Sequence, residues 1–166
     1  MSEERQRPIR VLVVDDDEAH AEALVDGLEI DGHLCQAAHS GKEAITLLEE
    51  KGFDCVLLDL VLHDMTGIDV LGEVMRLQPE AVSLMVTGHA TVETAVDAMR
   101  RGAVDYLTKP VNIAALRARL VNAVEAVRLR RDNIELRRQL DERFGFEGLI
   151  GHSPKMQRVL DRKSVV

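Results

Sequence analysis

Four short segments of the sequence carry side chains that could hold a cation and handle a phosphoryl group. They are Asp15-Asp16-Asp17, Asp59, Thr87 and Lys109-Pro110. Carboxylates gathered within a few ångströms of one another repel unless a cation neutralises them, and Mg²⁺ prefers such oxygen ligands. With the cation, one carboxylate can act as a nucleophile toward phosphorus, while an ammonium and a hydroxyl offset charge on the phosphoryl oxygens. Together the four segments indicate metal-assisted phosphoryl chemistry.

Each segment has a simpler interpretation when it is taken alone. An Asp that follows a strand is usually a helix cap, and Asp17 with Glu18 fits that role. The phosphate-binding pattern G-x-x-x-x-G-K-S/T does not occur in the sequence, so no nucleotide is expected by that route. The phosphoryl group is therefore expected to come from another molecule.

The pattern of apolar and polar residues predicts a fold that would bring the four segments to one edge of a sheet. Five short apolar runs rich in β-branched residues alternate with longer amphipathic stretches, as in a parallel sheet covered by helices on both faces. The expected strands are 9–14, 34–38, 54–58, 82–86 and 104–107, and the expected helices are 18–30, 41–51, 66–77, 91–101 and one beginning at 113. Ligands of such sheets bind outside the carboxyl ends of the strands, where all four segments fall.

Local signals mark several helix boundaries. Asp31-Gly32 is expected to end the first helix. Ser40 and Glu43 match a capping box, in which each side chain binds a backbone N–H near the other residue. Thr66 and Asn112 are expected to cap the third and the last helix.

The last helix is expected to be unusually long. From Ile113 to about Arg143 the sequence has no Gly or Pro, which predicts a helix about 45 Å in length. Its apolar positions are Ile113, Leu116, Leu120, Ala123 and Val127, then in a changed phase Leu129, Leu136 and Leu140, with Asn133 between them. This spacing favours a two-stranded coiled coil in which a polar residue sets the register. The alternative is an amphipathic helix that lies on its own domain.

The charge distribution divides the chain into an acidic front and a basic end. Residues 1–112 hold 22 acidic and 9 basic side chains, whereas residues 113–166 hold 7 acidic and 12 basic ones. The acidic excess in residues 1–112 argues against a nucleic-acid-binding surface and favours binding of divalent cations or basic partners. The arginines of the last helix are expected to form a solvated face with acidic neighbours.

Membrane insertion and disulfide chemistry are not expected. No apolar run approaches the roughly 18 residues of a membrane span, and the acidic N-terminus lacks the apolar core of a signal peptide. The sequence therefore predicts a cytoplasmic protein. Cys35 and Cys55 have neither C-x-x-C nor metal-ligand spacing, so both are expected to be small buried hydrophobic residues.

Four motifs at the predicted sheet edge form one specific pattern. They are Val13-Val14-Asp15-Asp16, Leu57-Leu58-Asp59, Val86-Thr87-Gly88 and Tyr106-Leu107-Thr108-Lys109-Pro110. This pattern resembles the receiver domain of two-component response regulators, and the resemblance spans residues 9 to about 125. It implies an α/β, flavodoxin-like, doubly wound sheet of five parallel strands in the order 2-1-3-4-5, here with an extended C-terminal linker helix.

The resemblance implies a phosphoacceptor and its metal ligands. Asp59 would accept a phosphoryl group from a sensor histidine kinase. Asp16 would bind Mg²⁺ with Asp15 beside it, helped by Asp59 and the backbone carbonyl of Val61. Such a domain is a signalling domain rather than a turnover enzyme.

The resemblance also implies a switch. Thr87 and Lys109 would contact the phosphoryl group, and Tyr106 would be the aromatic residue that swings inward when Thr87 moves. Phosphorylation would then remodel the face formed by the fourth helix and the fifth strand.

The sequence departs from the family pattern in the loop after Asp59. His63 stands where a proline is usual, so the geometry and mobility of this loop are expected to differ from those of the family. The resemblance implies that Val61 and His89, two residues beyond Asp59 and Thr87, would flank the path of a hydrolytic water and so influence the lifetime of the acyl phosphate. His63 and His89 are expected to be solvated loop residues rather than metal ligands, because Mg²⁺ prefers oxygen.

A second resemblance concerns the end of the chain. Leu149 to Leu160 resembles the opening of the AAA+ ATPase domain of sigma-54-dependent transcriptional activators of the nitrogen and dicarboxylate regulator type. This implies a receiver domain at 1–125, a coiled-coil linker helix at 126–146 and the truncated start of an ATPase domain at 147–166. No Walker motif is present, so this polypeptide is expected neither to hydrolyse ATP nor to bind DNA. Residues 161–166 do not continue the resemblance.

The predicted function is therefore that of a regulatory domain whose phosphorylation on Asp59 controls dimerisation through the linker helix and the receiver face. The full-length protein would contact sigma-54 RNA polymerase and DNA. The alternative is a Mg²⁺-dependent phosphohydrolase with an aspartyl nucleophile. That chemistry requires a second Asp two residues after the nucleophile, where this sequence has Val61.

Overall fold

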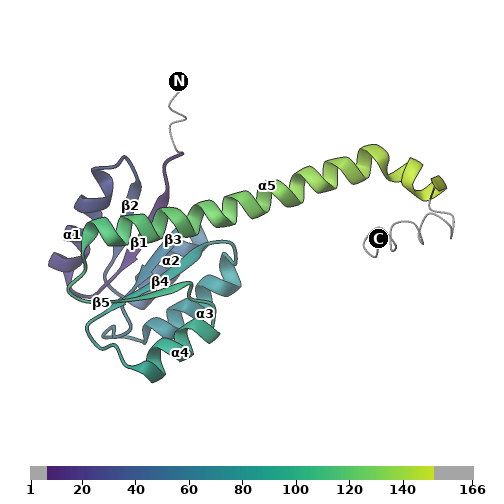
Figure 1. Ribbon diagram of the computed structural model, residues 1–166. Helices are drawn as coiled ribbons and strands as arrows, with labels where there is room; N and C mark the ends of the chain where they lie inside the picture. Colours follow the sequence, from purple (N-terminus) through teal and green to yellow (C-terminus); the bar gives the residue numbers. More distant parts are fainter. Residues whose placement is uncertain (1–6, 152–166) are drawn as a thin grey trace. The chain divides into compact units, whose positions relative to one another are not determined.

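Five parallel strands form a single sheet in the order β2-β1-β3-β4-β5, which confirms the predicted α/β, flavodoxin-like architecture (Figure 1). The computed structural model describes residues 7–151, with side chains described for residues 7–144. The strands are β1 (Arg10–Val14), β2 (Leu34–Ala38), β3 (Cys55–Leu58), β4 (Val82–Thr87) and β5 (Asp105–Thr108). The helices are α1 (Glu18–Glu29), α2 (Gly41–Glu50), α3 (Gly67–Leu77), α4 (Val92–Arg100) and α5 (Ile113–Gly151).

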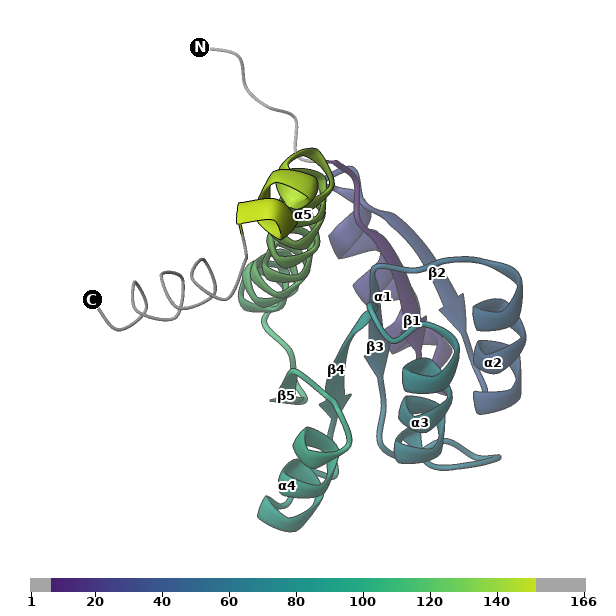
Figure 2. The same cartoon turned by 90° about the vertical axis from the view of Figure 1, so that its right-hand side faces the viewer.

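The sheet is buried on both faces because its inner strands are mainly apolar, with Ser83 and Thr87 as buried polar exceptions on β4. Successive side chains of a strand point to opposite faces, so Leu12 and Val14 enter one core while Val11 and Val13 enter the other. The first core contains residues of α2, α3 and α4, and the second contains residues of α1 and the start of α5. Figure 2 shows α2 and α3 on one side of the sheet and α1 and α5 on the other.

Most of the predicted helix boundaries are confirmed. Gly32 and Gly102 adopt positive φ angles (83° and 114°) just after α1 and α4, a conformation that glycine tolerates without strain. Thr66 caps α3 and forms a complete capping box with Asp69. The predicted box at α2 is incomplete: Ser40 accepts from the amide of Glu43, but the Glu43 carboxylate accepts from the amide of His39, one residue before the cap.

Helix α5 begins where expected and runs further than expected. The Asn112 side chain accepts a hydrogen bond from the amide of Ala115, and Leu116 and Leu120 are buried against the sheet. The prediction that the helix ends near Arg143 is wrong, because α5 continues to Gly151. Glycines in this last stretch lower helix propensity by about 1 kcal/mol each relative to Ala, and they do not prevent the helical conformation.

The chain divides into two units after Val127. In the second unit the side chains from Leu129 to Phe144 are exposed, including those of Leu129, Leu136 and Leu140. Residues 152–166, which include most of the segment that resembles the start of an ATPase domain, lie outside the described residues. Across the described helices, no stretch has the length and apolar character that a membrane crossing requires.

Candidate functional site

Asp15 and Asp59 extend side by side from the carboxyl ends of two neighbouring strands. Asp15 follows β1 and Asp59 follows β3, and the two residues are only 2% and 6% exposed. The amide of Asp15 donates to the carbonyl of Ala38, and the amide of Asp59 donates to the carbonyl of Val14. The hydrogen-bond ladders of the sheet therefore continue past the strand ends and fix the backbone of both acidic residues.

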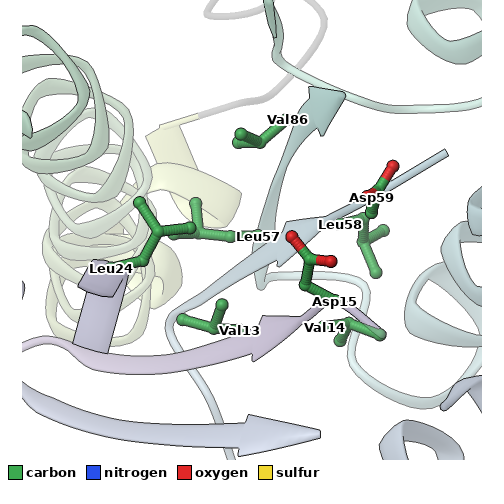
Figure 3. A pocket seen from close by; sticks show the side chains of 8 residues that line it. All are labelled: Val13, Val14, Asp15, Leu24, Leu57, Leu58, Asp59 and Val86. Atoms are coloured by element: carbon green, nitrogen blue, oxygen red, sulfur yellow. The ribbon is translucent and has the colours of Figure 1, made fainter. Parts of the chain in front are cut away.

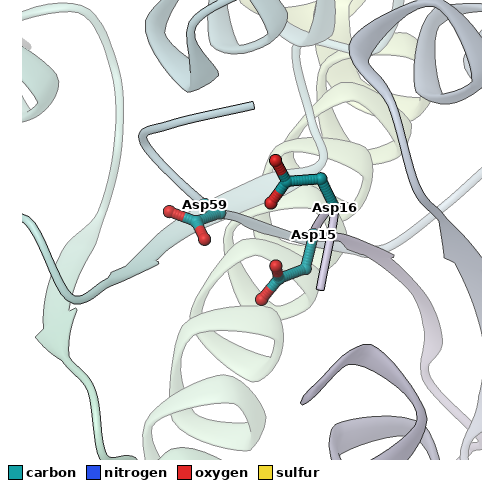
Figure 4. A group of neighbouring side chains, drawn as sticks. All are labelled: Asp15, Asp16 and Asp59. Carbon is teal, nitrogen blue, oxygen red and sulfur yellow. The ribbon is translucent and has the colours of Figure 1, made fainter. Parts of the chain in front are cut away.

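A third carboxylate, that of Asp16, completes an acidic cluster at this edge. One oxygen atom from each of Asp15, Asp16 and Asp59 lies within 4.8 Å of the others (Figure 4). In the part of the chain that the structure describes, this is the single group of three or more His, Cys, Asp or Glu residues arranged in this way. The donor set is all oxygen, which fits Mg²⁺ better than a soft transition metal.

Lys109 bridges two members of the cluster. Its Nζ atom lies 2.9 Å from Oδ2 of Asp15 and 2.8 Å from Oδ2 of Asp59, although these residues are 94 and 50 positions away in the sequence. Burial alone would lower the pKa of Lys109, but the hydrogen bonds to the two carboxylates outweigh it, so the pKa is raised above its ordinary value. The ammonium group is therefore charged and partly neutralises the acidic cluster.

Asp15 is the most densely bonded carboxylate of the site. Its Oδ1 accepts a hydrogen bond from the amide of Asp17, and its Oδ2 lies 2.6 Å from Nδ1 of His20. Burial alone would raise the pKa of Asp15, but the bonds from Lys109, Asp17 and His20 outweigh it, so the pKa lies below the ordinary value. Asp17 also caps α1 through the amide of His20, as the sequence predicted.

Two histidines next to Asp15 did not emerge from the sequence. His20 contacts the Asp15 carboxylate, and Nδ1 of His39 lies 3.2 Å from the Asp15 carbonyl oxygen. The sequence offers only a weak signal for the contact of His20 with Asp15, namely a histidine in the first helical turn after an acidic run. His39 gave no signal, because its approach to Asp15 depends on the pairing of β1 with β2.

An apolar layer lies directly beneath the two buried carboxylates. Figure 3 shows Asp15 and Asp59 beyond the ends of their strands, with Val13, Leu57 and Val86 among the side chains that line the same small cavity. This cavity has essentially no room for a water molecule. A ligand of the carboxylates must therefore approach from the outer side of the sheet edge, and electrostatic interactions at the site are strengthened by the apolar floor.

Thr87 and Tyr106 lie on the two strands at the Lys109 side of the site. Thr87 is the fully buried last residue of β4, and its Oγ1 accepts a hydrogen bond from the amide of His89. Its carbonyl accepts from the amide of Lys109. Tyr106 is half-buried on β5, and its hydroxyl lies 2.9 Å from Oγ1 of Thr94 in α4. The Tyr106 side chain therefore contacts α4 in this structure.

The loop of residues 59–66 carries Val61 and His63 at the rim of the acidic cluster. The amide of Val61 donates to Oδ1 of Asp59 at 3.2 Å, and the Val61 side chain is 47% exposed. His63 is exposed, as expected, and its Nδ1 lies 3.7 Å from Oδ2 of Asp16. His89 is exposed as well.

The two cysteines lie apart from this site. Cys35 and Cys55 are both in register with Val11, so strand β1 lies between them. Two strand spacings exceed the reach of a disulfide. Burial raises the pKa of Cys35 to about 12 and raises that of Cys55 further above its ordinary value. Cys55 is buried as expected, whereas Cys35 is only half-buried.

A second, larger cavity lies beside Lys109. Its volume is about 530 Å³, and it is lined by His20, Ala23, Leu24, Lys109, Pro110, Val111 and Ile113. Most of these residues are apolar. The cavity therefore offers a mainly hydrophobic surface beside Lys109, the residue that contacts Asp15 and Asp59.

Comparison with known proteins relates the chain to one family. The model of the response regulator receiver domain matches residues 11–121. Two curated relatives are the transcriptional regulatory protein ZraR of Salmonella typhimurium, 38% identical over 158 residues, and the alginate biosynthesis transcriptional regulatory protein AlgB of Pseudomonas aeruginosa, 39% identical over 156 residues. These matches cover 95% and 92% of the chain but only 35% and 33% of the relatives.

Solved structures give the same result. A CheY-like response regulator receiver domain from Methanospirillum hungatei superposes with a TM-score of 0.72 at 31% identity, covering 75% of the chain and 99% of that structure. NtrX from Brucella abortus superposes with a TM-score of 0.74 at 30% identity, covering 78% of the chain and 30% of that structure. The chain thus spans about a third of the length of its curated relatives.

Proposed function

Because the chain belongs to the response regulator receiver domain family, we propose that it is a phosphoacceptor signalling domain in which Asp59 takes up a phosphoryl group from a sensor histidine kinase. One observation carries this proposal. Lys109 lies within 3 Å of both Asp15 and Asp59, and the oxygens of three carboxylates meet in the same place. No purely structural role requires three acidic side chains and a lysine to meet at the rim of a sheet.

The residues that would hold Mg²⁺ are Asp15, Asp16, Asp59 and the backbone carbonyl of Val61. The carboxylate oxygens are close enough to one another to share one ion, and the amide of Val61 already contacts Asp59. Bound Mg²⁺ would neutralise charge on the phosphoryl oxygens. We expect the chain to bind it from the outer side of the cluster, since the inner side is apolar and closed to water.

In the phosphoryl transfer step, a carboxylate oxygen of Asp59 attacks phosphorus. The P–N bond to the donor imidazole breaks, and its electron pair stays on the imidazole nitrogen. Lys109 is already 2.8 Å from Asp59, so its ammonium would lie beside the incoming phosphoryl oxygens. The hydroxyl oxygen of Thr87 accepts a hydrogen bond from the amide of His89. The same hydroxyl group would donate a hydrogen bond to a further phosphoryl oxygen.

The donor must reach Asp59 from the outer side of the sheet edge. The cavity beside Lys109 gives residues around the donor histidine an apolar surface to contact. The same geometry argues against a phosphohydrolase that turns over substrate. Its acid–base residue would stand at position 61, where an exposed valine offers no proton. Val61 and His89 are instead expected to influence how long the acyl phosphate persists.

We further propose that Thr87 and Tyr106 relay the phosphorylation state. Movement of Thr87 toward a phosphoryl group would leave space beside β4 and β5, and Tyr106 would leave its contact with Thr94 to fill it. The face of α4 and β5 would then change shape. Such a change shifts a pre-existing equilibrium rather than creating a new state.

The position of this domain in a larger protein is also a proposal. We propose a receiver domain at 1–125, a linker helix at 126–146 and the start of an AAA+ ATPase domain at 147–166, as in sigma-54-dependent activators. The curated relatives are about three times as long as this chain and are transcriptional regulatory proteins. The corresponding full-length protein would act in the cytoplasm on sigma-54 RNA polymerase and DNA.

The acceptor assignment is tested with a small phosphodonor such as acetyl phosphate. Wild type should incorporate labelled phosphate only when Mg²⁺ is present, and Asp59→Asn should incorporate none. Asp26→Asn, at an exposed position on α1, is the matched control and should behave as wild type. Labelling of Asp59→Asn at the wild-type rate would refute the assignment.

The dimer assignment concerns the exposed seam of Leu129, Asn133, Leu136 and Leu140. Leu136 is 61% exposed on α5, and Ile134 is 62% exposed but lies outside the seam. Leu136→Glu should therefore shift sedimentation toward the monomer, whereas Ile134→Glu should not. An equal effect of the two substitutions would contradict the coiled coil and favour a general hydrophobic association.

A further inference from the structure

The loop between β3 and α3 is tied to the start of α2 by one side chain. Oδ1 of Asp64 accepts a hydrogen bond from the amide of Gly41 at 2.9 Å, and Oδ2 accepts one from the amide of Lys42 at 2.9 Å. These are the first two amides of α2, which have no partner within the helix itself. Ser40 serves the third amide, that of Glu43. The start of α2 is therefore capped jointly by its own N-cap and by a residue 23 positions away.

The residue after Asp64 adds a packing contact to the same junction. A Cβ atom on Gly41 would collide with the side chain of Met65, since even the Met65 methyl carbon would lie 3.0 Å from it. Met65 therefore occupies the space over Gly41. The carboxylate and the thioether hold the loop at two adjacent points.

The other end of this loop reaches the acidic cluster. Val61 pairs with Thr66 in an isolated antiparallel bridge, and the amide of Gly67 donates to the carbonyl of Leu60 at 2.7 Å. The loop is thus closed on itself, so a restraint at Asp64 is transmitted to Val61. The amide of Val61 in turn contacts the Asp59 carboxylate.

The start of α2 is itself connected to the opposite side of the cluster. Nδ1 of His39 contacts the carbonyl of Asp15, and the amide of Asp15 donates to the carbonyl of Ala38. Asp64 therefore links the side of the site that carries Asp59 and Val61 to the side that carries Asp15. His63 stands where the family resemblance leads one to expect a proline, so this loop needs a restraint other than a fixed φ angle.

We propose that Asp64 is a positioning residue for the metal site, which holds the 59–66 loop against α2 and so sets the place of the Val61 carbonyl relative to Asp16 and Asp59. This inference rests on the proposed function, because it assumes that Mg²⁺ binds at these oxygens. The hydrogen bonds from Gly41 and Lys42 lower the pKa of Asp64. The carboxylate is therefore charged at neutral pH and can accept both bonds.

The experiment measures Mg²⁺ binding directly by titration calorimetry on the full chain. Loss of a residue that orients metal ligands typically weakens metal binding by about 10- to 100-fold, so Asp64→Ala should raise the Kd for Mg²⁺ by about tenfold. Asp64→Asn retains one acceptor oxygen, and its Kd should rise by a smaller factor. Amide hydrogen exchange at Gly41, Lys42 and Val61 should become faster in both variants.

Ser40→Ala is the matched control, because it removes a cap hydrogen bond from the same helix without touching the loop. Its Kd should stay within about twofold of wild type although its melting temperature falls. Saturating Mg²⁺ should restore phosphate uptake by Asp64→Ala from acetyl phosphate to the wild-type rate, since the acceptor itself is intact.

Two results would overturn the inference. One is an unchanged Kd in folded Asp64→Ala, or in Asp64→Asn if the alanine variant does not fold. The other is an equal rise in Kd for Ser40→Ala, which would assign the effect to helix stability. A wild-type chain that binds no Mg²⁺ refutes the proposed function instead, whereas normal wild-type binding with an unaffected Asp64 variant refutes only the positioning role.

Discussion

Replacing Lys109 with methionine removes the one ammonium group that lies between Asp15 and Asp59. At an effective dielectric constant of about 20, charges 2.9 Å apart attract by roughly 6 kcal/mol, and the cost of desolvating the ions offsets part of this. Removing one partner of a buried pair typically costs about 3–5 kcal/mol. The Lys109 side chain is 22% exposed, so we expect Lys109→Met to lower the free energy of unfolding by about 3 kcal/mol at pH 7 without Mg²⁺.

The pH dependence of this loss follows from the two shifted pKa values. Asp15 has a lowered pKa, so its contribution is present above its unfolded pKa of about 3.9 and is lost as the pH falls through the folded value. Lys109 has a raised pKa, so its contribution is present below about pH 10.4 and is lost as the pH rises through the folded value. In Lys109→Met the charged Asp15 carboxylate has lost its ammonium partner. The difference in the free energy of unfolding between wild type and variant should therefore narrow as the pH falls below about 3.9 and Asp15 becomes protonated.

Mg²⁺ should rescue this variant, because the ion neutralises the same carboxylates. A ligand that binds only the folded state stabilises it by about 1.4 kcal/mol at ten times its Kd. We expect a larger increase for Lys109→Met than for wild type at equal Mg²⁺, since the ammonium no longer competes for the two carboxylates.

Urea denaturation followed by circular dichroism, with EDTA or with Mg²⁺, measures both effects. Lys42→Met, at an exposed position on α2, should change the free energy of unfolding by no more than about 0.5 kcal/mol. If Lys109→Met were as stable as wild type in EDTA, or if Mg²⁺ stabilised it less than wild type, the electrostatic account of the site would be wrong.

Two further predictions concern the residues around the site. Gly67→Ala should lower the free energy of unfolding by about 1–3 kcal/mol, because its Cβ would lie 2.9 Å from the carbonyl carbon of Asp59; Gly72→Ala in the same helix has open space and should raise it by about 0.5–1 kcal/mol in thermal melts. Equal melting temperatures of the two glycine variants would contradict the close approach of Gly67 to the backbone of Asp59. Thr94→Val removes the hydroxyl that holds Tyr106, a bond of about 1 kcal/mol, so beryllofluoride should bind about fivefold more tightly, while Thr94→Ser keeps the bond. Unchanged binding by both variants would mean that Tyr106 is not held in place by this bond.

The fold was predictable because its signals are local and repeated. Apolar runs such as Val11 to Val14 are buried on both faces of the sheet, and this pattern is typical of a parallel sheet. Placement of Asp15, Asp59, Thr87 and Lys109 at one edge followed from the same reasoning, since each lies at the carboxyl end of a strand or directly after it. The roles of Asp59, Thr87 and Tyr106 in signalling stay predictions.

The contacts that were not predictable are those between side chains that the fold brings together from distant positions. Asp64 binds the amides of α2 across 23 and 22 positions, and nothing in the sequence around Asp64 marks that partner. The contact of Tyr106 with Thr94 likewise depends on how α4 packs beside β5. The length of α5 was underestimated, because glycines reduce helix propensity without setting a definite end.

The order of the strands also determines where the molecule is mechanically compliant. Strands β1, β3 and β4 are interior strands with nearly complete burial, so a displacement there must disturb packing on two faces. Strand β5 is an edge strand whose residues are half-buried or exposed. It has a hydrogen-bonded neighbour on one side only. We therefore expect a displacement of Thr87 to be resisted more strongly toward β3 than toward β5. A displacement that begins at the acidic edge would then reach β5 and the neighbouring helix α4 more readily than the interior strands.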